Sequence, residues 1–194
     1  LFPLMITCWR NKWDQGDFSF YYVQIAPYEY GENSKSQLLR EAQLQTLSLP
    51  HTGMVVITDI GNPRNIHPGN KQDVGKRLAK WALAKDYGYE DMVYSGPLYE
   101  SMEVENQKIR LHFNHCGSGL QVQGDALNSF TIAGEDRKFY PARAEIENNT
   151  VVVWSPAVAK PAAVRFGWSN TPEPNLFNQQ GLPASPFRTD NWDK

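Results

Sequence analysis

The loop formed by residues 59–68 contains the side chains best suited to acid–base chemistry. His67 stands just before Pro68 and a predicted helix, and a histidine can take and return a proton near neutral pH. Asp59 opens this loop, and Asn65 lies two residues before His67. The loop follows a predicted strand, and open α/β sheets bind ligands at the carboxyl ends of their strands. Two roles are therefore open for His67: a general acid–base, or a loop histidine that bonds to local backbone. Local sequence alone favours the second role. A turn or cap role also remains open for Asp59.

Histidine and cysteine are too sparse to predict a metal site. Cys8 and Cys116 are far apart, without the paired spacing of a zinc site. His112 and His115 stand close together beside Cys116, but residues three apart on a strand point to opposite faces, which favours packing over metal binding. We expect no metal and no cofactor. Two buried free thiols are favoured over a disulfide, which stays possible.

The elements that position this loop form the first predicted domain, residues 1–91. Strand-like runs cover residues 18–25 and 54–58, and the second is apolar on both faces, as in a parallel sheet covered by helices. Apolar spacing predicts a helix over 4–13, with Met5, Cys8 and Trp9 on its apolar face. Two more helices are predicted over 34–47, with Ser34 as a cap, and over 71–85. Strand and helix alternate, which indicates a parallel α/β layer whose other strands lie upstream.

The second predicted domain, residues 92–194, is rich in short strands separated by turns. Apolar and polar residues alternate in several of them, as in half-buried antiparallel strands. The predicted strands are 98–104, 108–113, 119–122, 130–133, 142–146, 151–154 and 162–166. The turn residues Asn148 and Asn149 separate two of them. We predict an antiparallel β-sandwich-like domain, with an irregular tail from Thr171 that packs back onto a domain.

Composition excludes two classes of function. The chain has 194 residues, 41% of them hydrophobic, and a formal net charge of −2, which argues against nucleic-acid binding. The densest basic set, Lys71, Lys76, Arg77 and Lys80, is predicted to be a solvated helix face. No apolar run approaches the length needed to span a bilayer.

Several blocks of the sequence resemble the sialate O-acetylesterase family, a group of SGNH-type carbohydrate esterases. The block that contains the candidate histidine reads NIHPGNKQDVGKRLA, at residues 65–79. The other blocks lie, in the same order as in the family, at 9–10, 15–18, 22–27, 39–43, 52–54, 130–136, 164–168, 175–176 and 181–190. The resemblance implies the carboxyl-terminal portion of such an enzyme: an incomplete SGNH-hydrolase-like parallel sheet with flanking helices, followed by the β-sandwich-like domain.

The resemblance also implies a reaction, the removal of acetyl groups from sugar hydroxyls by serine and histidine. His67 takes the position of the histidine that activates the serine, while the serine itself belongs to an upstream segment of the same protein. Related sequences often place aspartate where this chain has Asn65, so either Asp59 orients the imidazole or His67 works in a dyad with a polar orienter such as Asn65. This chain alone is then expected to be inactive.

The same resemblance makes an acetylated sugar the expected partner, either sialic acid or a plant or host glycan. Tyr28 and Tyr30 follow a predicted strand, and their aromatic faces suit stacking on sugar rings. Arg64 is the cation nearest His67 in the sequence and would suit the carboxylate of sialic acid. A secreted or periplasmic location is implied by the family.

An alternative function rests on the β-rich half alone. It is either a carbohydrate-binding domain, with Trp154, Trp168 and Trp192 as a stacking surface, or a structural domain attached to a hydrolase. Core tryptophans are the more common outcome for such residues.

Overall fold

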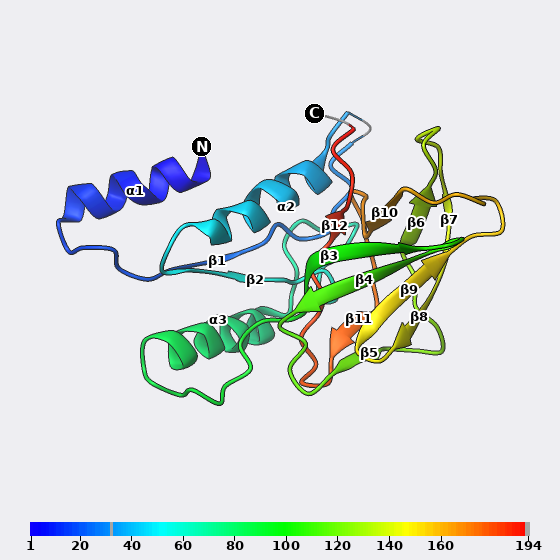
Figure 1. Cartoon of the computed structure of the whole chain (residues 1–194). Helices are drawn as coiled ribbons and strands as arrows, with labels where there is room; N and C mark the ends of the chain where they lie inside the picture. Colours follow the sequence, from blue (N-terminus) through cyan, green and yellow to red (C-terminus); the bar gives the residue numbers. More distant parts are fainter. Residues whose placement is uncertain (32, 193–194) are drawn as a thin grey trace.

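The first half of the chain is a three-layer arrangement of helices around two strands. A computed structural model describes residues 1–31 and 33–192. Figure 1 shows that β1 (Phe20–Val23) and β2 (Thr52–Val55) lie between helices above and below them. The helices are α1 (Phe2–Trp13), α2 (Ser36–Gln45) with the short 3-10 helix η1 (Thr46–Ser48), and α3 (Lys71–Lys85). β1 and β2 pair in parallel, as the alternation of strand and helix predicted.

The two strands bury different side chains on their two faces. Tyr22 and Met54 pack with residues of α1, α2 and η1, whereas Val55 and Ile57 pack with Trp81 of α3. This alternation follows from the period of two in a strand. Both faces of the pair are therefore apolar, which explains why the second strand reads as a continuous apolar run.

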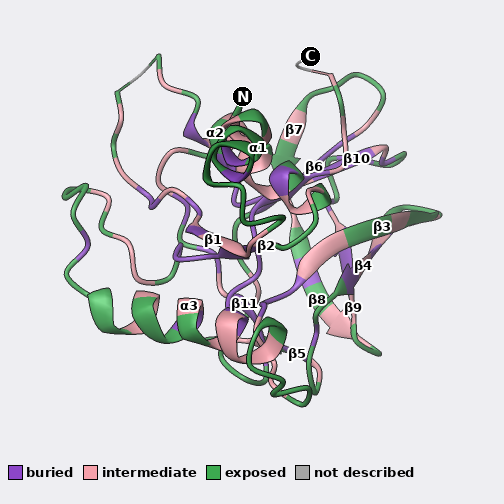
Figure 2. Ribbon diagram, turned by 90° about the vertical axis from the view of Figure 1, so that its left-hand side faces the viewer, coloured by how far each residue is buried: buried purple, intermediate pink, exposed green. Residues whose placement is uncertain are grey.

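The second half contains two four-stranded antiparallel sheets that share one core. One sheet has the order β3-β4-β9-β8, and the other has the order β12-β10-β6-β7. Their strands are β3 (Leu98–Glu105), β4 (Lys108–Asn114), β6 (Phe130–Ala133), β7 (Phe139–Pro141), β8 (Arg143–Glu147), β9 (Thr150–Trp154), β10 (Ala163–Phe166) and β12 (Phe187–Arg188). The buried residues of both sheets form one apolar cluster, and Figure 2 colours such buried segments of the chain purple. This packing fits the predicted sandwich.

The tail of the chain departs from the predicted irregular structure. It contains β11 (Leu176–Asn178), which pairs with β5 (Leu120–Val122), and β12, which pairs with β10. β12 also lies next to the first half, because Arg188 forms a two-bond ion pair with Glu41 of α2 at 2.8 and 2.9 Å. The tail therefore packs back as expected, and it does so through regular strands.

Other local predictions differ from the structure. α1 begins at Phe2 and buries Ile6 and Arg10, while Cys8 and Trp9 are exposed. Both cysteines are free, but only Cys116 is buried. α2 begins after Lys35, and the Ser34 hydroxyl donates to the carbonyl of Gly31 instead of capping the helix.

Two findings bear on broader classes of function. No helix among the described residues is long and apolar enough to cross a membrane. Within residues 1–31 and 33–192, no group of three or more histidine, cysteine, aspartate or glutamate residues is arranged to hold a metal ion.

Candidate functional site

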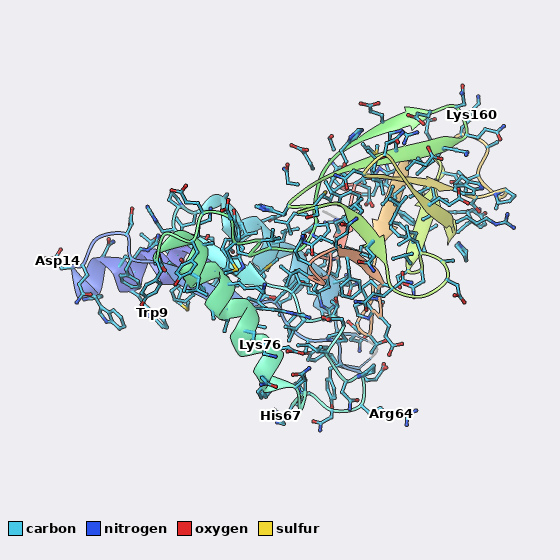
Figure 3. The ribbon with its side chains drawn as sticks, turned by 90° about the horizontal axis from the view of Figure 1, so that it is seen from below. Trp9, Asp14, Arg64, His67, Lys76 and Lys160 are labelled. Atoms are coloured by element: carbon cyan, nitrogen blue, oxygen red, sulfur yellow. The ribbon has the colours of Figure 1, made fainter. Side chains whose placement is uncertain are left out.

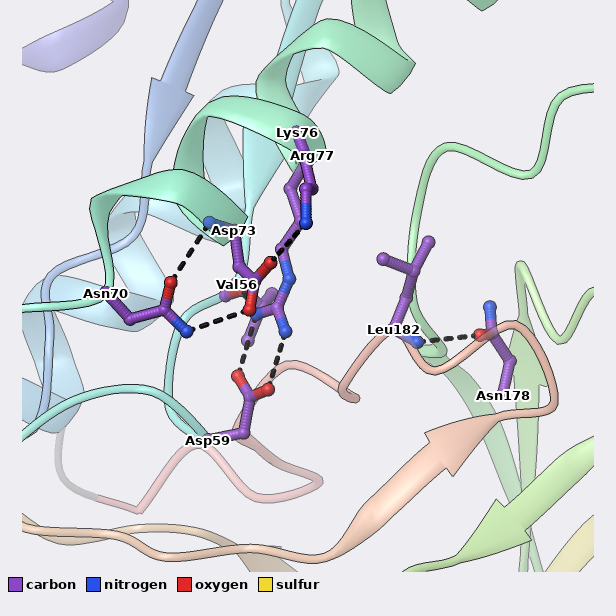
Figure 4. Close-up of polar contacts among 8 residues, drawn as sticks. All are labelled: Val56, Asp59, Asn70, Asp73, Lys76, Arg77, Asn178 and Leu182. Atoms are coloured by element: carbon purple, nitrogen blue, oxygen red, sulfur yellow. Dashed lines mark hydrogen bonds and ion pairs between the residues drawn. The ribbon is translucent and has the colours of Figure 1, made fainter.

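The loop that carries His67 is anchored at its first residue by an ion pair with α3. Arg77 donates two hydrogen bonds to the Asp59 carboxylate, at 2.7 and 2.5 Å, and a third to the carbonyl of Val56 at 2.7 Å (Figure 4). The Arg77 and Asp59 side chains are only 10% and 16% exposed. A two-bond pair with a planar guanidinium fixes direction as well as distance. The start of the loop is therefore held against the end of β2.

Arg77 corrects the prediction of a fully solvated basic face. Its side chain is buried between α3 and β2, whereas Lys76 is exposed and pairs with Asp73. The signal was present in the sequence, because Arg77 lies three residues after Val74 and four before Trp81, on the apolar stripe of the helix. The spacing places Arg77 on the buried side of the helix, and the prediction of a solvated position rested only on its charge.

His67 lies exposed at the opposite end of this loop. Figure 3 shows His67 and Arg64 at the lower edge of the molecule. The side-chain oxygen of Asn65 accepts a hydrogen bond from the backbone N–H of His67 at 2.9 Å, and Asn62 does the same for Arg64. These are Asx turns, in which a short amide side chain fixes the local backbone. The imidazole is thus presented on a shaped loop and is open to a partner group.

The loop that follows β1 lies directly against the His67 loop. The N–H of Glu29 donates to the carbonyl of Pro63 at 2.9 Å. Gly61 packs on Pro27 so closely that a Cβ atom there would be 2.5 Å from the proline ring. The carboxyl ends of both strands therefore carry adjacent loops, as expected for neighbouring parallel strands.

The two candidate tyrosines belong to this second loop. The rings of Tyr28 and Tyr30 meet edge to face, with centroids 5.0 Å apart. The Tyr30 hydroxyl donates to the carbonyl of Ala26 at 3.3 Å, and burial raises the pKa of this hydroxyl. Both side chains are half-buried, so each keeps part of its ring accessible.

The candidate residues thus come from two loops that touch, but they do not form a bonded triad. Both carboxylate oxygens of Asp59 bind Arg77, and the Asn65 side chain binds backbone. In the described part of the chain, neither side chain bonds to the imidazole of His67. Their roles as orienting groups stay predictions.

A cavity of about 240 Å³ lies beside these loops. Its lining includes Thr58 and Asp59 from the end of β2, Pro27 from the neighbouring loop, and Glu173 and Asn175 from the tail. The cavity places polar side chains of the β-rich half next to Asp59. His67, Arg64, Tyr28 and Tyr30 are not among its lining residues.

The fold is similar to that of a carbohydrate acetylesterase, as comparison with known proteins shows. No family model matches the chain. The structure is similar to the crystal structure of a carbohydrate acetylesterase from Xanthomonas citri, with a TM-score of 0.93 and 47% identity over 98% of this chain and 45% of that chain.

The particular relatives are sialate O-acetylesterases, and the resemblance seen in the sequence is confirmed. The rat protein is 26% identical over 218 residues, and the human protein is 28% identical over 219 residues. Each alignment covers 96% of this chain. The chain spans 40% of the rat protein and 41% of the human protein.

Proposed function

We propose that this chain is the carboxyl-terminal portion of a carbohydrate O-acetylesterase, similar to sialate 9-O-acetylesterases, that removes acetyl groups from sugar hydroxyls. The observation that carries the proposal is the likeness to the Xanthomonas citri acetylesterase, 47% identical across 98% of this chain. The curated sialate O-acetylesterases support the same class of reaction. The chain spans less than half of each of these relatives, which supports the assignment of the activity to a longer protein.

In this proposal His67 supplies the proton transfers. The imidazole takes the proton of a serine hydroxyl from an upstream segment of the same protein, and the serine oxygen attacks the acetyl carbonyl carbon. The imidazolium then gives its proton to the departing sugar oxygen, which leaves an acetyl-serine. His67 next takes a proton from water, whose oxygen attacks the acetyl-serine, and the imidazolium returns that proton to the departing serine oxygen as acetate is released. An exposed imidazole on a fixed loop is suited to a nucleophile that arrives from another segment.

Asp59 and Asn65 act on His67 through the loop in this scheme. Asp59 fixes the start of the loop through Arg77, and Asn65 fixes the backbone of His67 itself. The enzyme then works with a serine–histidine dyad in which polar groups set the position of the imidazole. Direct orientation by the Asp59 carboxylate would require it to leave Arg77.

The substrate is an acetylated sugar that lies across the two loops. Tyr28 and Tyr30 present partly accessible rings for stacking on a pyranose. The exposed Arg64 suits the carboxylate of sialic acid, whereas a neutral plant or host glycan has no need of it. A secreted or periplasmic location accords with such substrates.

The strands of the upstream segment would complete an SGNH-like sheet beside β1. β1 pairs with β2 on one side and is less buried than β2.

The division into an α/β part, residues 1–91, and a β-rich part, residues 92–194, is part of the same proposal. Separate apolar clusters on the two sides support it.

The β-rich half has a structural role in this proposal. The three tryptophans considered as a sugar-stacking surface have cationic groups over their rings, which occupy faces that a sugar would need. Lys108 lies 4.6 Å from the centroid of Trp154, Arg188 lies 5.0 Å from Trp168, and Arg137 lies 5.5 Å from Trp192.

The experiment that tests the proposal compares this chain with a longer protein that carries the upstream segment. Both are assayed for acetate release from acetylated sialic acid and from an aryl acetate. We expect turnover only from the longer protein. Turnover by this chain alone, stopped by His67→Ala, would mean that a nucleophile lies within these 194 residues and would overturn the proposed division of roles.

A further inference from the structure

A buried arginine connects the tyrosine loop to the β-rich half. Arg40 of α2 is fully buried, at 0% exposure, and donates four hydrogen bonds to backbone carbonyls. Two of these carbonyls, of Ile25 and Ala26, belong to the start of the loop, at 3.0 and 3.1 Å. The other two, of Ser169 and Asn170, belong to a turn after β10, at 2.7 and 3.0 Å. Burial lowers the pKa of the guanidinium to about 10, so Arg40 remains a cation at neutral pH.

Asn170 makes the same connection from the other side. Its side-chain oxygen accepts from the backbone N–H of Ser36 at 3.1 Å and from the Ser36 hydroxyl at 2.8 Å, at the start of α2. Its side-chain nitrogen donates to the Ser34 hydroxyl at 2.9 Å. Its backbone carbonyl accepts from the N–H of Tyr28 at 3.2 Å. One residue of the β-rich half therefore contacts the tyrosine loop at Tyr28 and the segment that follows the loop at Ser34 and Ser36.

These contacts leave the loop with little freedom of its own. Four carbonyl oxygens point at one guanidinium, and without that cation those of Ile25 and Ser169 would lose this donor and all four would repel one another. Lysine cannot replace it fully, because an ammonium has three donors and lacks the planar fork that reaches two segments at once. The position of Tyr28 and Tyr30 is thus set by groups outside their own loop.

We propose that Arg40 and Asn170 are positioning residues that hold the tyrosine loop, residues 26–31, in the conformation that binds the sugar part of the substrate. The inference rests on the proposed esterase function and deepens it. It gives the β-rich half a specific task, which is to set the sugar-binding loop through the turn at Ser169 and Asn170. Neither residue touches the reacting atoms, so the acetyl transfer itself does not depend on them.

The test uses Asn170→Ala in the longer enzyme, with two substrates. We expect KM for an acetylated sugar to rise by ~10-fold, while kcat and the hydrolysis of a small aryl acetate stay within about twofold of wild type. Hydrogen exchange at the amides of Tyr28 and Glu29 should become faster. Asn170→Asp keeps the acceptor for Ser36 and loses the donor to Ser34, so it should restore part of the sugar KM.

The matched control is Asn178→Ala, which removes three hydrogen bonds inside the β-rich half, to Ser95, His115 and Leu182, without touching the tyrosine loop. It should lower the melting temperature and leave the ratio of the two KM values unchanged. An unchanged sugar KM in Asn170→Ala, or an equal change for both substrates, would overturn the inference. His67→Ala distinguishes failure of this inference from failure of the proposed function. If His67→Ala loses turnover while Asn170→Ala keeps a wild-type sugar KM, only this inference is overturned. If His67→Ala retains turnover, the proposed function is overturned.

Discussion

Asp59 and Arg77 form a pair whose strength decides how firmly the His67 loop is held. Both side chains are largely buried, and removing one partner of such a pair leaves the other without compensation. We predict that Asp59→Asn lowers the free energy of unfolding by ~1–3 kcal/mol. Arg77→Lys should lower it by a similar amount, because lysine cannot make the two-bond contact. Urea denaturation of the single and double variants measures the coupling between them.

The control for this prediction lies one turn away on the same helix. Asp73 pairs with Lys76, and both side chains are exposed, so solvent screens their attraction. Lys76→Ala should leave stability nearly unchanged. If the Asp59 and Arg77 variants also leave stability unchanged, or if their effects simply add, the pair does not anchor the loop.

Among individual residues, the sequence indicated the two candidate loops better than it indicated the residues that hold them in place. The His67 loop and the tyrosine loop were predicted from their place after strands, and the structure puts them in contact. Arg77 was misassigned because charge was weighed above its helical spacing. Two of the four carbonyls that Arg40 contacts lie 129 and 130 residues away in the chain, and no local pattern indicates them.

Among the elements, β2 depends on a glycine for its contact with α3. A Cβ atom at Gly53 would lie 2.5 Å from the ring of Trp81 and 2.7 Å from that of Tyr21. Trp81 cannot shift freely, because its indole N–H donates to the carbonyl of Met54 at 3.0 Å. We predict that Gly53→Ala lowers the free energy of unfolding by ~1–3 kcal/mol through overpacking.

Gly75 offers a matched control, since a Cβ atom there would meet nothing within 4 Å. Gly75→Ala should raise stability by ~0.5–1 kcal/mol, because alanine restricts the unfolded chain and favours the helix. Thermal and urea denaturation of both variants gives the comparison. A stable Gly53→Ala protein with normal Trp81 fluorescence would contradict a tight contact between Gly53 and Trp81.

Elements with local signals were predicted well. The turn at Asn148 and Asn149 has positive φ at both residues, 47° and 64°, as a two-residue hairpin loop requires, and asparagine tolerates such angles. α3 was predicted with its observed bounds. The strands β11 and β12 were missed, because they have only three and two residues and exist through pairing with distant strands.

Across the whole molecule, a chain of charges connects α2 with the β-rich half. Arg165 binds the Asp190 carboxylate with two hydrogen bonds of 2.8 Å, Arg188 lies 3.9 Å from Asp190, and Arg188 in turn binds Glu41 of α2. Burial alone would raise the pKa of Asp190, but hydrogen bonds from Arg165 and the Trp192 backbone and the charges of both arginines lower it overall. The ionised carboxylate is therefore the form that the fold stabilises.

The lowered pKa of Asp190 sets the pH range over which its ionised carboxylate stabilises the fold. A depressed carboxyl pKa gives stability that is present above the unfolded value, near 3.8, and is lost as pH falls through the lower folded value. Asp190→Asn should therefore cost ~3 kcal/mol at pH 7, and the gap from wild type should narrow below about pH 4. Melting curves from pH 3 to pH 7 check this. A gap that stays constant over that range would show that the charge of Asp190 is not what matters.

His67 is the residue on which the proposed reaction depends most, and its role is tested by the rate of acetate release from an acetylated sugar by the longer enzyme and its His67→Ala variant. We predict that the rate falls by ~10³-fold or more, because every proton transfer of the reaction passes through the imidazole. The melting temperature should stay unchanged, since His67 is exposed. A folded variant that keeps a near-normal rate would remove His67 from the mechanism and contradict the account.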